Sequence, residues 1–436
     1  MEKHDERFIN LPFYKKASKK ILDFDQKYSE ICQEYERIGS MDFFWREKVE
    51  EFIKRLENFL ETIINTKTDD EFEKIILQNL KDRIISQKGI LEKKTNPDMS
   101  YPESLGKIYG IGEKETEIVK KYAENIKLKK IFEEVEKYSY SFASLSTEEE
   151  IEKIFSFSKK FLKKIYNENG MNGDFKEYED YIKTIEFSKM SGNSYHFTGK
   201  VVLSANSMRN VQFYDFKSSE FKRYPDVIQL AELIGEETLL GHQGHYLLTK
   251  NLTNLKLFTY SGLFEKCSTE TVTLFGKYKG SELLIKNLEE FPDLCPKNLA
   301  KNLKEFYDLE KELNFINSFG RCFSNILFSK NKLNESFSYF HKLLDDPYYD
   351  SKKAKVIIRN YYECGNFYRE EAENQRRFIY LISYINERRI SDMLKKLPKE
   401  KSIIIEKYMR FGYWSISAFE MYLKFLINKV NKGEIN

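Results

Sequence analysis

The chain has few of the residues that interrupt helices and few of those that build disulfide-bonded folds. Its 436 residues include only 8 prolines and 19 glycines, so long helices can run without a break. The five cysteines are scattered, odd in number and without a Cys-x-x-Cys pair, which argues against a disulfide framework. We therefore expect a mostly helical protein with reduced thiols, located in the cytoplasm.

Long apolar runs and an excess of one charge are also absent. No segment approaches the roughly 20 apolar residues of a membrane span, and the charged first residues lead into no apolar core of signal-peptide length. The 72 lysines and arginines nearly balance the 69 aspartates and glutamates, which gives no general attraction to nucleic acid or anionic lipid. We expect no membrane partner and no general nucleic-acid partner.

Two common catalytic signatures are missing as well. The sequence has no phosphate-binding glycine loop of the Walker type and no Gly-x-Ser-x-Gly nucleophile elbow. Nucleotide-driven and serine-hydrolase functions can therefore be set aside.

Hydrophobic residues are plentiful and recur at helical spacing. They make up 41% of the chain, and aromatic residues make up 15%, which is ample for a packed core. Phe52, Leu56, Phe59 and Ile63 form one such stripe. The length exceeds that of a usual single domain. The glycine-containing segment Gly170–Asp174 is the expected junction between two domains. We therefore predict an N-terminal helical domain over residues 1–175 and a catalytic domain over residues 176–436.

One short segment departs from the helical pattern. Tyr195–Ala205 is rich in β-branched and aromatic residues, which predicts a strand of one small β-sheet beside the helix that carries the candidate site. Pro225-Asp226 then predicts the start of a single helix from Val227 to Thr249. Ile403 to Val430 is predicted to be the final helix.

The candidate site is a group of histidines and carboxylates. His242 and His245, two of only five histidines, follow the adjacent carboxylates Glu236 and Glu237. Glu270 comes where a second, antiparallel helix could return it to the same place. Two imidazoles with nearby carboxylates are the ligands that a catalytic zinc ion requires, with one position open for water. Since such ligands cluster nowhere else in the sequence, they predict zinc-assisted hydrolysis.

Three short motifs, in order, resemble the bacterial family known as domain of unknown function 885, helical zinc-peptidase-like proteins of the gluzincin type. Glu236-Glu237-Thr-Leu-Leu-Gly241-His242-Gln-Gly-His245 corresponds to that family's His-Glu-x-x-Pro-Gly-His-His-x-Gln. Glu270-Thr-Val-Thr-Leu274-Phe275 corresponds to Glu-Gly-Trp-Ala-Leu-Tyr. Tyr362-Glu-Cys-Gly365, with Arg369 after it, corresponds to a C-terminal Tyr-x-x-Gly. The match spans roughly residues 180 to 436 and implies a zinc-dependent peptidase.

The resemblance also implies roles for individual residues. By position, Glu237 is the general base, His242 and Glu270 hold the zinc, and Tyr362 is a catalytic residue that stabilises the oxyanion. The family's first histidine is Glu236 in this sequence. The third zinc ligand is then either Glu236 itself or His245, since both residue types ligate zinc; otherwise the metal is bound weakly or lost.

The expected partner of such a site is a peptide or protein substrate. Zinc peptidases commonly align their substrate on an edge strand through main-chain hydrogen bonds, so Tyr195 and His196 are candidate substrate-binding residues, together with Arg369. A catalytically silent relative that keeps the fold and binds a peptide is the alternative.

A third hypothesis is association with DNA. Leu105–Val119 resembles a helix-hairpin-helix module, in which a Gly-Ile-Gly turn offers backbone N–H groups to a phosphate. Glu113, Glu115 and Glu117 surround that turn, whereas a phosphate site should be basic. A plain turn between two helices also explains the pattern.

Overall fold

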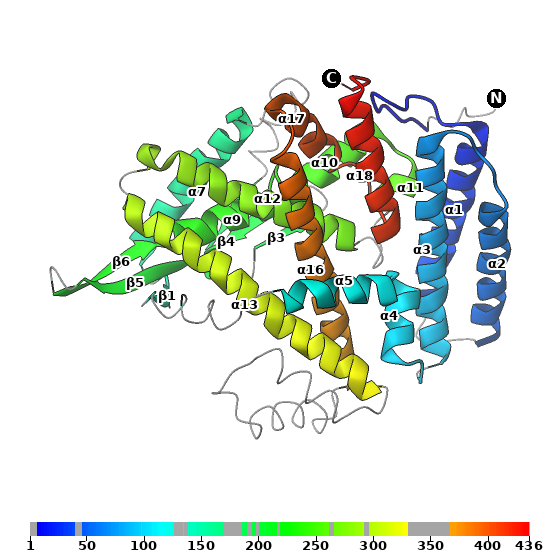
Figure 1. The fold of residues 1–436 in the computed structure, drawn as a ribbon, viewed down its shortest axis with the longest axis horizontal. Helices are drawn as coiled ribbons and strands as arrows, with labels where there is room; N and C mark the ends of the chain where they lie inside the picture. Colours follow the sequence, from blue (N-terminus) through cyan, green and yellow to red (C-terminus); the bar gives the residue numbers. More distant parts are fainter. Residues whose placement is uncertain are drawn as a thin grey trace.

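Figure 1 shows the fold as a ribbon, from a computed structural model of the chain. The structure describes residues 7–39, 46–96, 98–125, 134, 138, 140–145, 147–168, 185–189, 194–197, 200–215, 219–260, 266–291, 296–329 and 367–435. The mostly helical class predicted from the sequence is confirmed. No helix within these ranges combines the length and the apolar character that crossing a membrane requires.

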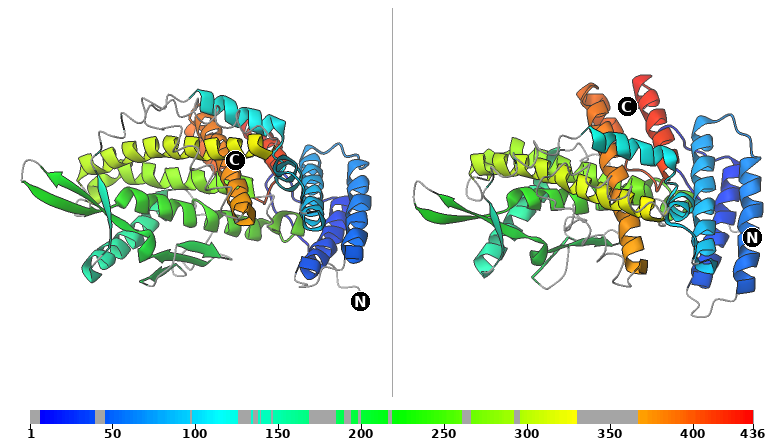
Figure 2. Two further views of the ribbon diagram at one scale, coloured as in Figure 1. Left: turned by 90° about the horizontal axis from the view of Figure 1, so that it is seen from below. Right: turned by 60° about the horizontal axis from the view of Figure 1, so that its bottom comes forward.

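The helices of the first part of the chain are spread along the molecule, with α7 in the half that contains the strands (Figure 1). They are α1 (Lys19–Gly39), α2 (Arg46–Ile64), α3 (Glu71–Thr95), α4 (Tyr101–Tyr109), α5 (Glu113–Glu124) and α7 (Glu148–Glu168). Figures 1 and 2 show α1, α2 and α3 side by side at the end where the chain begins. The predicted stripe on α2 is confirmed, because Phe52, Leu56, Phe59 and Ile63 are all buried.

The later helices build the body of the molecule. They are α9 (Val227–Glu237), α10 (His242–Leu252), α11 (Lys256–Thr259), α12 (Lys266–Lys286), α13 (Lys297–Ser329), α16 (Phe367–Leu394), α17 (Lys399–Tyr408) and α18 (Ile416–Asn431). The single final helix expected from Ile403 to Val430 is wrong. Helix α17 ends at Tyr408, and Gly412, with a φ of 76°, has a left-handed conformation that a continuous α-helix through this segment could not contain.

The described strands form two small sheets, where one was expected. The first contains β1 (Ser141–Ser144), β5 (Arg209–Asp215) and β6 (Glu220–Pro225) in the order β1-β5-β6, and both pairings are antiparallel. The second contains β2 (Glu186–Ser188), β4 (Lys200–Ser204) and β3 (Tyr195–Phe197) in the order β2-β4-β3. Pro225 ends β6, and α9 begins two residues later with Asp226 as its N-cap.

The predicted single strand Tyr195–Ala205 is therefore two strands. β3 pairs with β4 in antiparallel register, with Tyr195 opposite Val202 and His196 opposite Val201. Thr198-Gly199 separates them in the sequence, and a two-residue connection with glycine is typical of a hairpin. The central strand is β4, and β3 lies at an edge of the sheet.

Two hydrophobic clusters hold these elements together. The larger one joins the N-terminal helices to the C-terminal helix, as in the contact between the rings of Phe72 and Phe425, whose centroids are 5.6 Å apart. The predicted domain boundary at residues 175–176 lies outside the described residues, and this cluster contains side chains from both sides of it. The smaller cluster joins α4, α5, α13 and α16 through side chains such as Val119, Phe319 and Phe378.

The helix-hairpin-helix-like segment is a packing turn. Gly110 takes the left-handed conformation that ends α4, with a φ of 66°, and Ile111 is buried in the smaller cluster. The backbone N–H of Gly112, which a phosphate would need, donates to the Glu115 carboxylate at 2.9 Å. A glutamate of the same chain thus occupies the anion position of this turn.

Candidate functional site

The candidate site lies where the predicted helix Val227–Thr249 breaks in two. The prediction of one continuous helix is wrong, because α9 ends at Glu237 and α10 begins at His242. In the turn between them, the N–H groups of both Gly241 and Gly244 donate to the carbonyl oxygen of Thr238, at 3.0 and 3.2 Å. The backbone folds onto itself so tightly that only glycine fits at these positions, and the turn redirects the chain just before His242.

Helix α12 packs on α9 with backbone against backbone. A Cβ added to Gly235 would lie 2.4 Å from the carbonyl oxygen of Gly276, and a Cβ added to Gly280 would lie 2.3 Å from that of Ala231. Since Gly276 faces Gly235 while the later Gly280 faces the earlier Ala231, the two helices run antiparallel. Glycines at the crossing permit this approach and bring polar side chains beside the contact close together.

The close approach places Lys277 of α12 against Glu236 of α9. The Lys277 ammonium donates to Glu236 Oε2 at 3.0 Å, and both side chains are partly buried, with exposures of 27% and 21%. Burial opposes the charged form of Lys277, but the carboxylates of Glu236 and Glu232 outweigh it and raise the pKa of the lysine. The residue that the family resemblance assigns to the first metal-ligand position is therefore held by an ammonium group.

Glu237, the predicted general base, lies among like charges. Burial, followed by the charges of Glu236 and Glu270, raises its pKa to about 8. The electrostatic effect of Glu270 on Glu237 indicates that α12 returns Glu270 to the region of the α9 carboxylates. At neutral pH, Glu237 is then mostly protonated.

Glu232 lies one helical turn before Glu236 and belongs to the same group. It is only 5% exposed, and its Oε1 has no hydrogen-bond partner within the described residues. Burial raises the pKa of Glu232 to about 7, although Lys277 and Lys304 oppose the shift. We call Glu232, Glu236, Glu237 and Glu270 the carboxylate cluster; Lys277 is ion-paired within it.

These shifts predict how stability depends on pH. A carboxyl whose pKa is raised in the folded protein contributes stability that is complete below its unfolded pKa, near 4.5, and that is lost as pH rises through about 8. Glu237→Gln, which mimics the protonated form, is expected to be more stable than the wild type at pH 9 by at least about 1 kcal/mol. This is a lower bound, because a pKa shift of one unit corresponds to about 1.4 kcal/mol of stability. Urea denaturation at pH 5 and pH 9 measures this, with the exposed Glu220→Gln as control. Equal pH slopes for the wild type and Glu237→Gln would contradict it.

The two histidines face different surroundings. Burial lowers the pKa of His242, against the opposing effect of Glu236, so its imidazole is neutral at neutral pH and lies near the carboxylate cluster. His245 is buried, its Nε2–H donates to the carbonyl oxygen of Gly412 at 3.0 Å, and its ring meets that of Tyr413 edge-on at 4.4 Å between centroids. His245 therefore connects α10 to the loop between α17 and α18. To act as a zinc ligand, its side chain would have to leave Gly412 and turn toward Glu236.

The loop between α17 and α18 also forms hydrogen bonds with the turn between α9 and α10 and with α10. Arg410 donates from Nε to the carbonyl oxygen of Leu240 at 2.9 Å, and the Gly412 N–H donates to Thr249 Oγ1 at 2.8 Å. Sequence reasoning missed Arg410 and Lys277 as parts of the site. A signal existed for Lys277, which follows Glu270 by seven residues and so lies two turns further along the same helix face. Arg410 has no such signal, because it lies 170 residues from Leu240.

The remaining predicted site residues are not brought into this region by any described contact. Tyr195 and His196 belong to the edge strand β3, and Arg369 lies in the first turn of α16. Tyr362 lies outside the described residues. Their predicted roles remain predictions.

Two of the four predicted zinc ligands are engaged within the protein. Catalytic zinc sites use three protein ligands and a water. Glu236 is paired with Lys277, and His245 is hydrogen-bonded to Gly412. Across the described ranges, no group of three or more histidine, cysteine, aspartate or glutamate side chains is arranged to hold a metal ion.

Comparison of the chain with models of protein families, with curated proteins and with solved structures gives no match. The resemblance to the domain of unknown function 885 family therefore rests on the three short motifs alone.

Proposed function

We propose that this chain is a peptide-binding protein related in architecture to zinc peptidases, in which an ion pair has replaced the metal. The carboxylate cluster would bind a cationic group of the peptide, such as its amino terminus. The observation that carries the proposal is the Lys277 ammonium at 3.0 Å from Glu236, where the resemblance calls for a metal ligand. It means that these carboxylates already accept an ammonium ion as their counter-charge.

The charge balance of the site supports a second cation. Glu232, Glu236 and Glu237 all interact electrostatically with the single ion-paired Lys277, and the pKa values of Glu232 and Glu237 are raised to about 7 and about 8. Burial is the main cause of both shifts, and the charges of neighbouring carboxylates add to it. An ammonium group entering the site would restore their ionised form and would give the buried Glu232 Oε1 a hydrogen-bond donor.

The competing function is zinc-dependent peptide hydrolysis, as the motif resemblance implies. What favours it is that the charge of Glu270 acts on Glu237, and that the charge of Glu236 acts on both Glu237 and His242. What opposes it is that Lys277 would have to leave Glu236 before a third ligand became available.

Calorimetric titration separates the two functions. We expect tri-alanine amide with a free amino terminus to bind at least about tenfold more tightly than its N-acetylated form, because one charge-assisted hydrogen bond contributes about 1.5–3 kcal/mol. Glu236→Gln is expected to abolish this preference, with Glu220→Gln as the exposed control.

Zinc titration and elemental analysis are the second arm of this experiment. We expect less than one zinc per chain, and no difference in zinc content between the wild type and His242→Ala. One zinc per chain, lost in His242→Ala, together with cleavage of tri-alanine, would establish the hydrolase instead. Equal affinity for the free and acetylated peptides would reject the ammonium site.

A further inference from the structure

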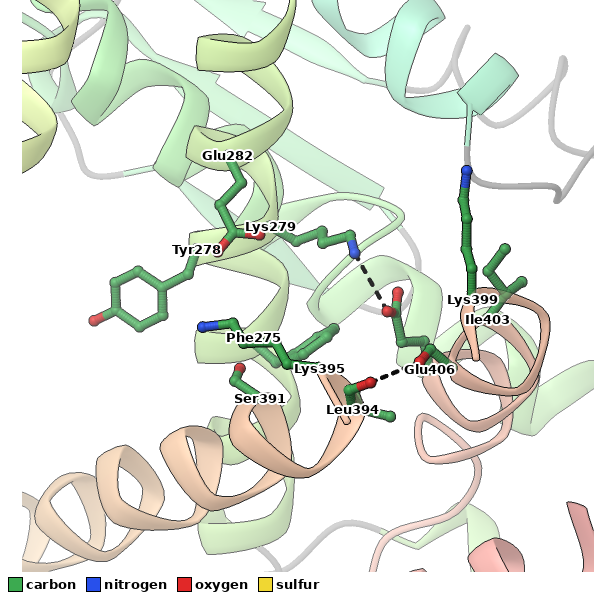
Figure 3. Close-up of a pocket in the computed structure, with 11 residues that line it drawn as sticks. Phe275, Tyr278, Lys279, Glu282, Ser391, Leu394, Lys395, Lys399, Ile403 and Glu406 are labelled. Atoms are coloured by element: carbon green, nitrogen blue, oxygen red, sulfur yellow. Dashed lines mark hydrogen bonds and ion pairs between the residues drawn. The ribbon is translucent and has the colours of Figure 1, made fainter. Parts of the chain in front are cut away.

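A cavity that shares no residue with the carboxylate cluster lies between α12, the end of α16 and the first two turns of α17. Its volume is about 240 Å³ (Figure 3). Phe275 of α12 and Leu394 of α16 line it and are each 5% exposed, whereas Ile403 of α17, which also lines it, is 44% exposed. The cavity therefore opens to solvent and has an apolar wall on each of its three helices.

Charged side chains surround these apolar walls. Lys279 of α12 is paired with Glu406 of α17 at 3.2 Å, as the dashed line in Figure 3 marks. Lys395 and Lys399 point to opposite sides of the cavity. The positive charge is therefore divided between two sides of the rim, and an apolar group suits the space between them.

An apolar group of suitable size is exposed elsewhere on the molecule. Phe221 of β6 is 76% exposed, the highest value among the large hydrophobic side chains in the part of the chain that the structure describes. It lies in the hairpin of β5 and β6, which projects from the body at the end opposite α1 and α2 (Figures 1 and 2). Both figures place α17 away from this hairpin, so Phe221 does not reach the cavity of its own chain.

We propose that the Phe221 ring of one copy of this chain docks in the cavity of a second copy. The cavity is large enough, because an apolar cavity of about 150 Å³ binds benzene. Phe275, Leu394 and Ile403 would contact the ring from three helices. The contact would remove the exposed surfaces of both Phe221 and Ile403 from water, which is favourable.

The charges on the two surfaces are compatible with this contact. Glu220 and Lys222 flank Phe221 along β6, so the hairpin presents one acidic and one basic group beside the ring. Within the described residues, neither Lys395 nor Lys399 is ion-paired with a carboxylate. Glu220 of the docking copy can therefore pair with a lysine of the rim, and neither surface carries charge of only one sign that would oppose the approach.

The contact joins two different surfaces and is therefore heterologous. Each copy would insert its hairpin into one neighbour and offer its cavity to another. One ring and its surroundings bury far less than the roughly 1,200–2,000 Å² of a stable interface, so the association is expected to be weak.

Sedimentation velocity of the full chain, from about 5 to about 500 μM, tests the contact over the range expected for a small interface. The wild type is expected to self-associate as its concentration rises. Phe221→Ser removes the ring, and Ile403→Arg places a long charged side chain in the cavity. Each is expected to raise the dissociation constant at least about tenfold. Phe8→Ser and Ile64→Arg are the matched controls, since these residues are 45% and 58% exposed and belong to neither surface.

A mixture of the two variants tests the heterologous geometry. Phe221→Ser keeps an intact cavity, and Ile403→Arg keeps an intact ring. The mixture is therefore expected to form one-to-one pairs, although neither variant associates by itself. A contact between two identical surfaces would not be restored in this way.

Three results would overturn the proposal. They are a wild type that stays monomeric at about 500 μM, a dissociation constant that Phe221→Ser or Ile403→Arg changes no more than its control does, and a mixture that associates no more than the single variants. All of the substituted residues are exposed, so the variants are expected to fold, and far-UV circular dichroism checks this. Neither the hairpin nor the cavity contains a residue of the carboxylate cluster, so the outcome is independent of the peptide proposal.

Discussion

Gly244→Ala is expected to cost more than about 4 kcal/mol of unfolding free energy, or to prevent folding altogether. A Cβ at this position would lie 1.8 Å from the carbonyl oxygen of Leu239 and 2.7 Å from its carbonyl carbon. Both atoms belong to the backbone of the tight turn, so no side-chain rotation relieves the clash. The turn would have to open, which would move His242 away from the carboxylate cluster and His245 away from Gly412.

Gly106→Ala provides the matched control for this prediction. Gly106 is also helical, in α4, but a Cβ added there would meet no heavy atom within 4 Å. Because alanine has the higher helix propensity, this variant is expected to be more stable than the wild type by about 0.5–1 kcal/mol. Urea denaturation followed by far-UV circular dichroism measures both changes. A Gly244→Ala protein with wild-type stability would show that the turn between α9 and α10 is not packed as described.

Lys277→Met is expected to destabilise the protein by about 2–3 kcal/mol at pH 8, somewhat less than the loss of one partner from a fully buried ion pair. The substitution keeps most of the apolar stem but leaves Glu236 without its ammonium partner in a partly buried position. The cost is expected to shrink as pH falls below 7, because protonation of Glu232 and Glu237 removes negative charge beside Glu236.

Two further variants show whether the ion pair itself is the cause. The double variant Lys277→Met/Glu236→Gln is expected to recover at least about 1 kcal/mol relative to the sum of the single changes, since the two groups interact directly. Lys297→Met removes a lysine from an exposed pair with Glu289, whose side chains are 69% and 84% exposed. That change is expected to cost less than about 1 kcal/mol. If Lys277→Met costs no more than Lys297→Met, the pair with Glu236 does not stabilise the site.

Local patterns in the sequence were sufficient for the helical class and for part of the site. The stripe through Phe52 and Phe59 predicted the buried face of α2, because side chains three and four residues apart share one face of a helix wherever that helix packs. The grouping of Glu237 with Glu270 also followed from the sequence, since two antiparallel helices of that spacing bring such positions together. These features depend on helical periodicity and chain direction, which are local properties.

Only the tertiary structure decided which side chains at the site are available to a ligand. His242 and His245 cannot be distinguished by residue type. In the structure, however, the His245 imidazole is hydrogen-bonded to the carbonyl oxygen of Gly412, 167 residues away in the sequence. Glu236 is engaged by Lys277 because α9 and α12 touch at Gly235 and Gly276, a contact that no local pattern specifies. The break between α9 and α10 likewise depends on Arg410 and on backbone contacts across the turn. Hydrogen bonds and ion pairs between distant segments form only after packing has brought those segments together. The hydrophobic periodicity of a single segment therefore does not predict which residue of another segment it will contact.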